Sequence, residues 1–124
     1  MTFLGFTIAS PILAEMPAPL IANLEKLLGT PRDGALLRYS LGTEYLKAGE
    51  RERGIAALRE AVARDPQYSA AWKALGRALA DDGREDEATT AWTQGIAAAH
   101  ARGDKQAEKE MTVFARRLQK KRGA

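Results

Sequence analysis

The sequence is poor in the residues from which many catalytic and metal sites are built. It has no cysteine among 124 residues, which excludes disulfides, thiolate zinc sites and cysteine nucleophiles. Its single histidine excludes a metal site with several histidine ligands. The net charge of +3 is too small to indicate nucleic-acid binding by itself. The length predicts one domain, and 45% apolar with 28% charged residues is typical of a soluble globular protein.

Sequence motifs of the common nucleotide-binding and hydrolytic sites are missing as well. The chain has no phosphate-binding P-loop, no dinucleotide-binding glycine pattern, no zinc-protease helix motif and no nucleophile elbow. His100 is the one histidine that could act as a general base, and no serine lies near it in the sequence. We therefore expect a protein that is not an enzyme and uses no cofactor, no metal and no small-molecule substrate.

The first sixteen residues are apolar and precede the helical part of the chain. The apolar run over residues 3–14 is shorter than the roughly 20 residues that span a bilayer, so no membrane association is expected. A secretory signal has a basic start, which is absent, and Pro11 interrupts the run. Three interpretations stay open: a degenerate signal, a flexible extension over residues 1–16, or a natural start at Met16. We expect the extension and a cytoplasmic protein, with export as the alternative if residues 1–15 act as a signal.

A period of 34 residues runs through the middle of the chain. When the sequence is shifted by 34 residues, two Leu-Gly pairs coincide, together with further glycines and alanines. The coinciding residues are Leu41 and Leu75, Gly42 and Gly76, Gly49 and Gly83, Ala57 and Ala91, and Ala63 and Ala97. Apolar residues around them recur at three- and four-residue steps, which indicates amphipathic helices and no strands.

Glycines, prolines and capping residues divide this pattern into six helices. Glycine readily takes the left-handed conformation that ends a helix, so Gly49 and Gly83 are expected to end helices. Proline disfavours a helical residue before it, which predicts breaks before Pro31 and Pro66. Side chains that can cap a helix start precede or open three of the helices: Asp33, Ser69 and Asp104. The predicted helices cover residues 18–29, 34–48, 51–64, 69–82, 85–102 and 104–121.

A 34-residue helix pair with these residues resembles the tetratricopeptide repeat. That repeat carries a large residue, a Leu-Gly pair and an aromatic residue on its first helix. Its second helix carries small and large apolar residues and is followed by proline. The first matching set is Arg38, Leu41, Gly42, Tyr45, Gly54, Leu58 and Pro66. The second set is Trp72, Leu75, Gly76, Leu79, Ala88 and Trp92, with His100 in place of proline.

The resemblance implies an all-α, right-handed solenoid of antiparallel helix pairs with about two and a half repeats. Residues 17–124 would then form one domain. It would contain a half repeat over 17–32, repeats over 35–68 and 69–102, and a capping helix with a basic tail over 103–124. Small residues at the helix crossings would let the backbones approach closely, and the two tryptophans would pack in the core.

Two residues depart from the pattern of the repeat. Arg38 stands at a large apolar position, so its stem is expected to pack while its charged head reaches water. His100 stands where a proline would end the helix, which predicts a helix that continues to Arg102.

The resemblance also implies a function in protein–protein interaction, as an adaptor or assembly factor. In this family the first helix of each repeat lines a concave groove that binds a peptide or helix of another protein. Lys73 and Arg77 are four residues apart and share a helix face, where they could receive acidic groups of a partner. The match places eight residues in this groove: Leu36, Tyr39, Thr43, Leu46, Lys47, Lys73, Arg77 and Asp81.

Two other functions stay open. The first is a self-associating structural module, for which a homodimer is the simplest form. The second uses the five cations of residues 116–122 to bind nucleic acid. Met111, Phe114 and Leu118 form an apolar seam at helical spacing in the same segment, which predicts a cap packed on the last repeat. Nucleic-acid binding is therefore the less favoured alternative.

An acidic cluster surrounds Gly83. It lacks the alternating oxygen-ligand spacing and the closing glutamate of a calcium loop. Since anions stabilise the start of a helix, we expect a structural role for its members, which are Asp81, Asp82, Glu85, Asp86 and Glu87.

Overall fold

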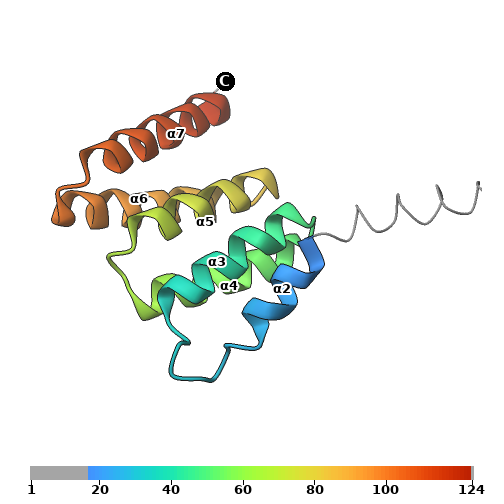
Figure 1. Ribbon diagram of the computed structural model, residues 1–124. Helices are drawn as coiled ribbons and strands as arrows, with labels where there is room; N and C mark the ends of the chain where they lie inside the picture. The colour runs from blue at the N-terminus through green and yellow to red at the C-terminus, as the bar shows by residue number, and fades with distance from the viewer. Residues whose placement is uncertain (1–16, 124) are drawn as a thin grey trace, which may run out of the picture.

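The computed structural model describes residues 17–123, which form helices joined by turns (Figure 1). The described part contains six α-helices. They are α2 (Pro17–Glu25), α3 (Ala35–Lys47), α4 (Arg51–Arg64), α5 (Ser69–Asp81), α6 (Glu85–Arg102) and α7 (Lys105–Gly123). The predicted extension over residues 1–16 lies outside the described residues.

Consecutive helices pack as antiparallel pairs, and the pairs stack on one another. The most extensive packing is between α3 and α4, between α5 and α6, and between α6 and α7. Helix α2 lies on α3, and α4 joins the two pairs by contacting α5. Helix α5 also contacts both α3 and α7, so these three helices follow one another along one side of the stack (Figure 1).

The helix predicted over residues 18–29 is shorter in the structure. It ends at Glu25, and residues 26–29 form hydrogen-bonded turns, as in the bond of 3.0 Å from the Leu27 N–H to the Leu24 carbonyl. Leu24 and Leu27 still pack against the apolar cluster that α2 shares with α3. A period of three to four residues does not distinguish a helix from a series of tight turns, which explains the error. The other five predicted helices agree with the structure to within about two residues.

Glycine turns end α3 and α5, as predicted. Gly49 and Gly83 have φ of 82° and 78°, in the left-handed region that glycine adopts without strain. After α3 the Gly49 N–H donates to the Leu46 carbonyl and the Glu50 N–H donates to the Tyr45 carbonyl, at 3.1 and 2.9 Å. These two bonds satisfy carbonyls that the helix leaves without a partner at its end.

The predicted helix starts are right at one position and wrong at two. The Asp104 carboxylate accepts the Ala107 N–H at 3.1 Å, which is the expected cap of α7. Asp33 instead binds the Gly29 N–H and the Arg38 guanidinium. Ser69 is the first residue of α5, and its hydroxyl bonds to Asp104 at 3.2 Å. The partner of Ser69 lies 35 residues later in the chain, whereas the partners of Asp33 lie within five residues of it.

Small residues lie where helices cross, as expected. A Cβ atom added to Gly42 would approach the Leu58 side chain to 2.7 Å, and one added to Gly76 would overlap the indole of Trp92. The core of the stack is filled by large side chains that are almost fully buried: Leu41, Leu58, Leu75, Leu79 and Met111. Trp92 is buried, with 4% of its surface exposed, whereas Trp72 is half-buried and donates its indole N–H to the Pro66 carbonyl.

The two residues that depart from the repeat pattern have different outcomes. Helix α6 continues past His100 to Arg102, as predicted. The guanidinium of Arg38 was expected to reach water. It instead makes two hydrogen bonds, of 3.0 and 2.9 Å, to the Asp33 carboxylate. The Arg38 side chain is 22% exposed. A paired cation therefore takes the place of a large apolar side chain at this position.

Candidate functional site

The side of the stack formed by α3, α5 and α7 has two adjoining hollows. The first, of about 590 Å³, lies between α3 and α5 and is lined by Leu46, Gly49, Arg51, Ala74, Arg77, Ala78 and Asp81. The second, of about 300 Å³, is called here the α5–α7 cleft. It is lined by Arg77, Ala80, Asp81, Trp92, Phe114, Arg117, Leu118 and Lys121. Arg77 and Asp81 line both hollows and so connect them.

Of the eight residues predicted from the sequence, three line these hollows. Arg77 and Asp81 line both, and Leu46 lines the first. Among the others, Leu36 is 69% exposed, and the Lys47 ammonium group lies 3.2 Å from the Glu44 carboxylate.

Tyr39 contacts the turn between α4 and α5, and Thr43 bonds within its own helix. The ring of Tyr39 packs against that of Tyr68, with 5.0 Å between the centroids. The Thr43 hydroxyl donates to the Ser40 carbonyl at 2.9 Å. Neither residue lines the two hollows.

Lys73 is held by an ion pair across two helices. Its ammonium group lies 2.8 Å from the Glu110 carboxylate of α7. This bond, with a second from Gln106, lowers the pKa of Glu110 below its ordinary value. Because Lys73 is paired with Glu110, it joins α5 to α7 and does not line the hollows. Of the two cations predicted for the groove, only Arg77 lines them.

The Arg77 guanidinium contacts the aromatic ring of Phe114, at the bottom of the α5–α7 cleft. The central carbon of its guanidinium lies 5.4 Å from the centroid of the Phe114 ring, within the range of a cation–π interaction. Phe114 in turn packs against Trp92, with centroids 5.6 Å apart and the rings tilted by 44°. The Trp92 indole N–H donates to the Lys73 carbonyl at 3.4 Å. The floor of the α5–α7 cleft is therefore fixed by packing and by a hydrogen bond to the backbone.

Helix α7 supplies the wall that sequence reasoning missed. Phe114 and Leu118 were assigned to the apolar seam of a cap, and Arg117 and Lys121 to the basic tail, yet all four line the cleft. Their spacing of three and four residues places them on one helix face. That spacing was visible in the sequence, but the match to the repeat ended before α7.

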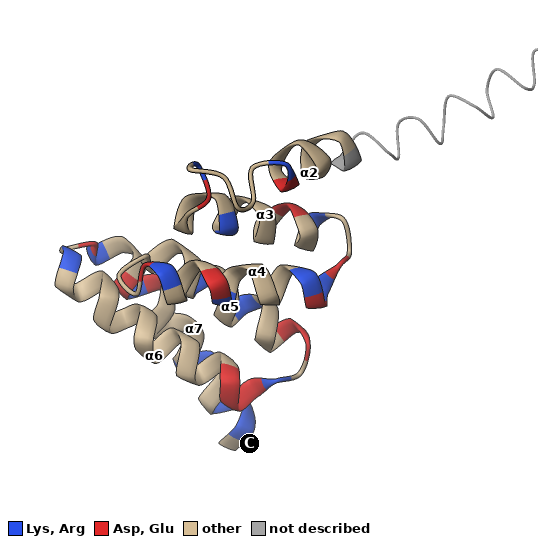
Figure 2. Ribbon diagram, turned by 90° about the horizontal axis from the view of Figure 1, so that it is seen from below, with Lys and Arg blue, Asp and Glu red and all other residues tan. Residues whose placement is uncertain are grey.

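The cations near the cleft differ in their pairing. Lys121 lies 3.5 Å from Glu85, and Arg122 lies 2.8 Å from Asp86. These pairs place the basic end of α7 beside the acidic start of α6 (Figure 2). Within residues 17–123, Arg77 and Arg117 form no ion pair. They are thus the cations of the cleft that remain available to a bound group.

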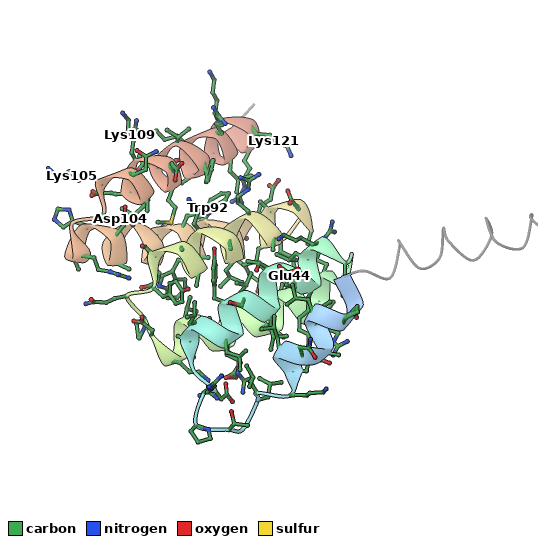
Figure 3. All side chains as sticks on the ribbon, viewed as in Figure 1. Glu44, Trp92, Asp104, Lys105, Lys109 and Lys121 are labelled. Carbon is green, nitrogen blue, oxygen red and sulfur yellow. The ribbon has the colours of Figure 1, made fainter. Side chains whose placement is uncertain are left out.

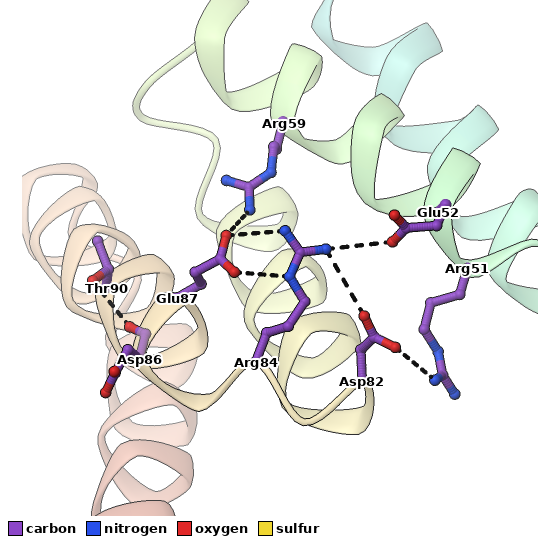
Figure 4. A network of polar contacts seen from close by, with 8 residues as sticks. All are labelled: Arg51, Glu52, Arg59, Asp82, Arg84, Asp86, Glu87 and Thr90. Atoms are coloured by element: carbon purple, nitrogen blue, oxygen red, sulfur yellow. Dashed lines mark hydrogen bonds and ion pairs between the residues drawn. The ribbon is translucent and has the colours of Figure 1, made fainter.

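Most of the acidic cluster around Gly83 forms ion pairs inside the protein (Figure 4). The Arg84 guanidinium binds Glu87 at 2.8 and 3.1 Å and reaches Glu52 at 3.3 Å. Asp82 binds Arg51 at 3.1 Å. This network joins α4, α6 and the turn before α6, as expected for a structural cluster. Among the described residues, no group of three acidic or histidine side chains is placed to hold a metal ion.

The described helices include none that combines the length and the apolar character needed to cross a membrane.

Comparisons with known proteins agree with this architecture. A family model described as tetratricopeptide repeat matches residues 39–104. A TPR repeat-containing protein of Pseudomonas aeruginosa is 52% identical over 103 residues, which cover 83% of this chain and 98% of that protein.

Two solved structures are also similar. A solution structure from Bordetella parapertussis has 42% identity and a TM-score of 0.69, covering 82% of this chain and 88% of that one. A tetratricopeptide repeat domain protein from Salinibacter ruber has 28% identity and a TM-score of 0.66, covering 70% and 97%. The predicted all-α, right-handed solenoid of helix pairs is confirmed, and the chain belongs to the tetratricopeptide repeat family.

Proposed function

We propose that this protein is a non-enzymatic interaction module that binds a peptide or helix of another protein along α3, α5 and α7. Proteins of this family generally serve in protein interactions. The observation that carries the proposal is that the two hollows lie side by side and share Arg77 and Asp81. A continuous surface of this kind suits a chain segment better than a small molecule.

The size of the surface limits what it can hold. Neighbouring helices lie about 8–10 Å apart, so the surface from α3 across α5 to α7 spans roughly 20 Å. An extended chain advances about 3.3 Å per residue, so about six residues would fit. A site this short is expected to bind with modest affinity unless two copies of the protein act together.

Selection from a random peptide library tests this function. Heptapeptides displayed on phage would be selected on the full chain, and the enriched peptides titrated into ¹⁵N-labelled protein. We expect the amide signals of α3, α5 and α7 to shift more than those of α4 and α6. A library without enriched binders, or shifts confined to α4 and α6, would overturn the proposal.

A steric block provides the matched control. Ala74 lines the first hollow, so Ala74→Trp should weaken the selected peptides, whereas Ala97→Trp on an exposed position of α6 should not. The location of the NMR shifts does not depend on either variant folding well. Sedimentation of the free protein at several concentrations tests the homodimer alternative in the same samples.

A further inference from the structure

The α5–α7 cleft combines an apolar floor with cations at its edge. Phe114, Leu118 and Ala80 supply apolar surface, while Arg77, Arg117 and Lys121 supply three positive charges. Asp81 is the acidic residue in the lining, and Lys121 is paired with Glu85, so Arg77 and Arg117 are the cations that a ligand can reach. Such a lining favours a ligand that is apolar at its centre and negatively charged at its sides.

We propose that the α5–α7 cleft binds an acidic-hydrophobic peptide segment, in which one large apolar side chain enters the cleft and flanking Asp or Glu carboxylates meet Arg77 and Arg117. This inference rests on the proposed function and names the chemistry of the partner. It requires no free C-terminus of the peptide, because side-chain carboxylates supply the charge.

The position of Arg77 prepares it for a carboxylate. A cation–π contact uses the positive charge of a guanidinium and leaves its N–H donors able to form hydrogen bonds elsewhere. Contact with Phe114 therefore places the charge of Arg77 beside the apolar floor of the cleft without using those donors. A carboxylate can accept two parallel bonds from such a group.

The volume of the cleft restricts the apolar group. At about 300 Å³, the cleft is at the lower end of ligand sites, which span roughly 300–1,000 Å³. One aromatic or large aliphatic side chain with its adjoining backbone fits this space better than a cofactor does. Phe114, which packs on the buried ring of Trp92, gives that side chain an apolar surface to contact.

The surrounding acidic residues disfavour a nucleic acid in the same place. Asp81 lines the cleft, and Glu85 and Asp86 lie beside the basic end of α7. A continuous phosphate backbone would come close to these carboxylates, and like charges repel. A peptide with two carboxylates placed opposite Arg77 and Arg117 avoids them.

Three short peptides test the proposal directly. The probes are acetyl-Gly-Asp-Phe-Glu-Gly-amide, an Asn/Gln version without the charges, and an Ala version without the ring. Each would be titrated into ¹⁵N-labelled full chain. We expect the acidic Phe peptide to bind about tenfold or more tightly than either relative, with the largest shifts around Phe114 and Arg117.

A pair of double variants separates the cleft from general charge. Arg77→Gln/Arg117→Gln should weaken the acidic Phe peptide about tenfold or more. Lys105→Gln/Lys109→Gln removes as much charge from cations that point away from the stack (Figure 3) and should change its affinity less than twofold. Thermal unfolding of both variants shows whether each is folded.

Each remaining outcome counts against the inference. Equal affinity for the charged and uncharged peptides, or equal weakening by both double variants, would overturn it. Tighter binding of a single-stranded oligonucleotide, lost with Arg77→Gln/Arg117→Gln, would assign the cleft to nucleic acid instead. Library peptides that bind the first hollow would still support the proposed function, so failure of the inference is distinguishable from failure of the function.

Discussion

The loop between α2 and α3 is held by one carboxylate with several partners. Asp33 accepts two bonds from the Arg38 guanidinium and one of 2.9 Å from the Gly29 N–H. The Arg38 bonds, followed by the Gly29 bond, hold the pKa of Asp33 well below its ordinary value of 3.8. Together they connect the turns that follow α2 to the first turn of α3. Arg38 makes these bonds at a position where the repeat pattern has a large apolar residue.

The ionised Asp33 carboxylate should stabilise the fold at neutral pH, and this contribution should be lost in acid. A carboxyl group whose pKa is lower in the folded protein stabilises the fold above its unfolded pKa, and this contribution is lost as pH falls toward the folded pKa. We expect Asp33→Asn to lower the melting temperature at pH 7. The difference from the unsubstituted protein should shrink as pH falls below about 3.8.

Melting curves from pH 7 to pH 2 would measure this difference. Asp65→Asn is a suitable control, since Asp65 bonds to the nearby Gln67 N–H and lies outside the α2–α3 loop. A difference between Asp33→Asn and the unsubstituted protein that stays constant over the whole range would contradict the assigned ion pair.

At this scale the sequence predicts residue types better than residue partners. Lys73 and Arg77 were found because they share a helix face, and Arg77 does line both hollows. The partner of Lys73 is Glu110, 37 residues later in the chain. Spacing within a helix does not show which side chain of another helix lies opposite, so this pair became visible only in the structure.

Glycines have two different roles in the helices and turns. Gly83 has a φ of 78° and open space around its α-carbon, so its role is conformational. Gly76 lies inside α5, where the indole of Trp92 occupies the space that a side chain would need. The same substitution at these two positions should therefore act through different causes.

We expect both alanine variants to lower the free energy of unfolding. Gly83→Ala forces a left-handed backbone on alanine, which costs about 1–2 kcal/mol. Gly76→Ala overpacks the crossing of α5 and α6, which costs about 1–3 kcal/mol. Only Gly76→Ala should change the near-ultraviolet circular dichroism, because it displaces Trp92. Denaturant titration and the spectrum of the native state measure both effects, and an unchanged spectrum for Gly76→Ala would contradict the tight crossing.

The helices themselves were largely predictable from local pattern. Two Leu-Gly pairs 34 residues apart located the crossings, and Gly49 and Gly83 located the turns. The end of α2 was missed because Leu24 and Leu27 keep an apolar spacing through turns that are no longer α-helical. The spacing of apolar residues predicts which side chains face the core. It does not predict whether the backbone there forms α-helical hydrogen bonds or those of turns.

At the scale of the whole molecule, half of the candidate site could be predicted. The α5 half follows from the repeat, whose first helices line the groove in this family. The α7 half was assigned to a cap, although Phe114 and Arg117 line the cleft beside Arg77. In a solenoid each unit packs mainly on its neighbours, and α7, which packs on α6 and α5, lines the cleft that we propose as a binding site.

The packing of α7 on the core predicts the effect of shortening the chain. Met111 is fully buried, and Phe114 packs on the ring of Trp92, so a chain that ends at Gly103 exposes the core and should lose cooperative unfolding. Met111→Ala, which keeps the helix, should cost about 2–5 kcal/mol. A chain that ends at Gln119 keeps both contacts and loses exposed ion pairs worth about 1 kcal/mol or less each.

Thermal melts with a dye that binds exposed apolar surface would compare the three variants. Equal melting temperatures for the chains ending at Gly103 and Gln119 would show that α7 does not close the core.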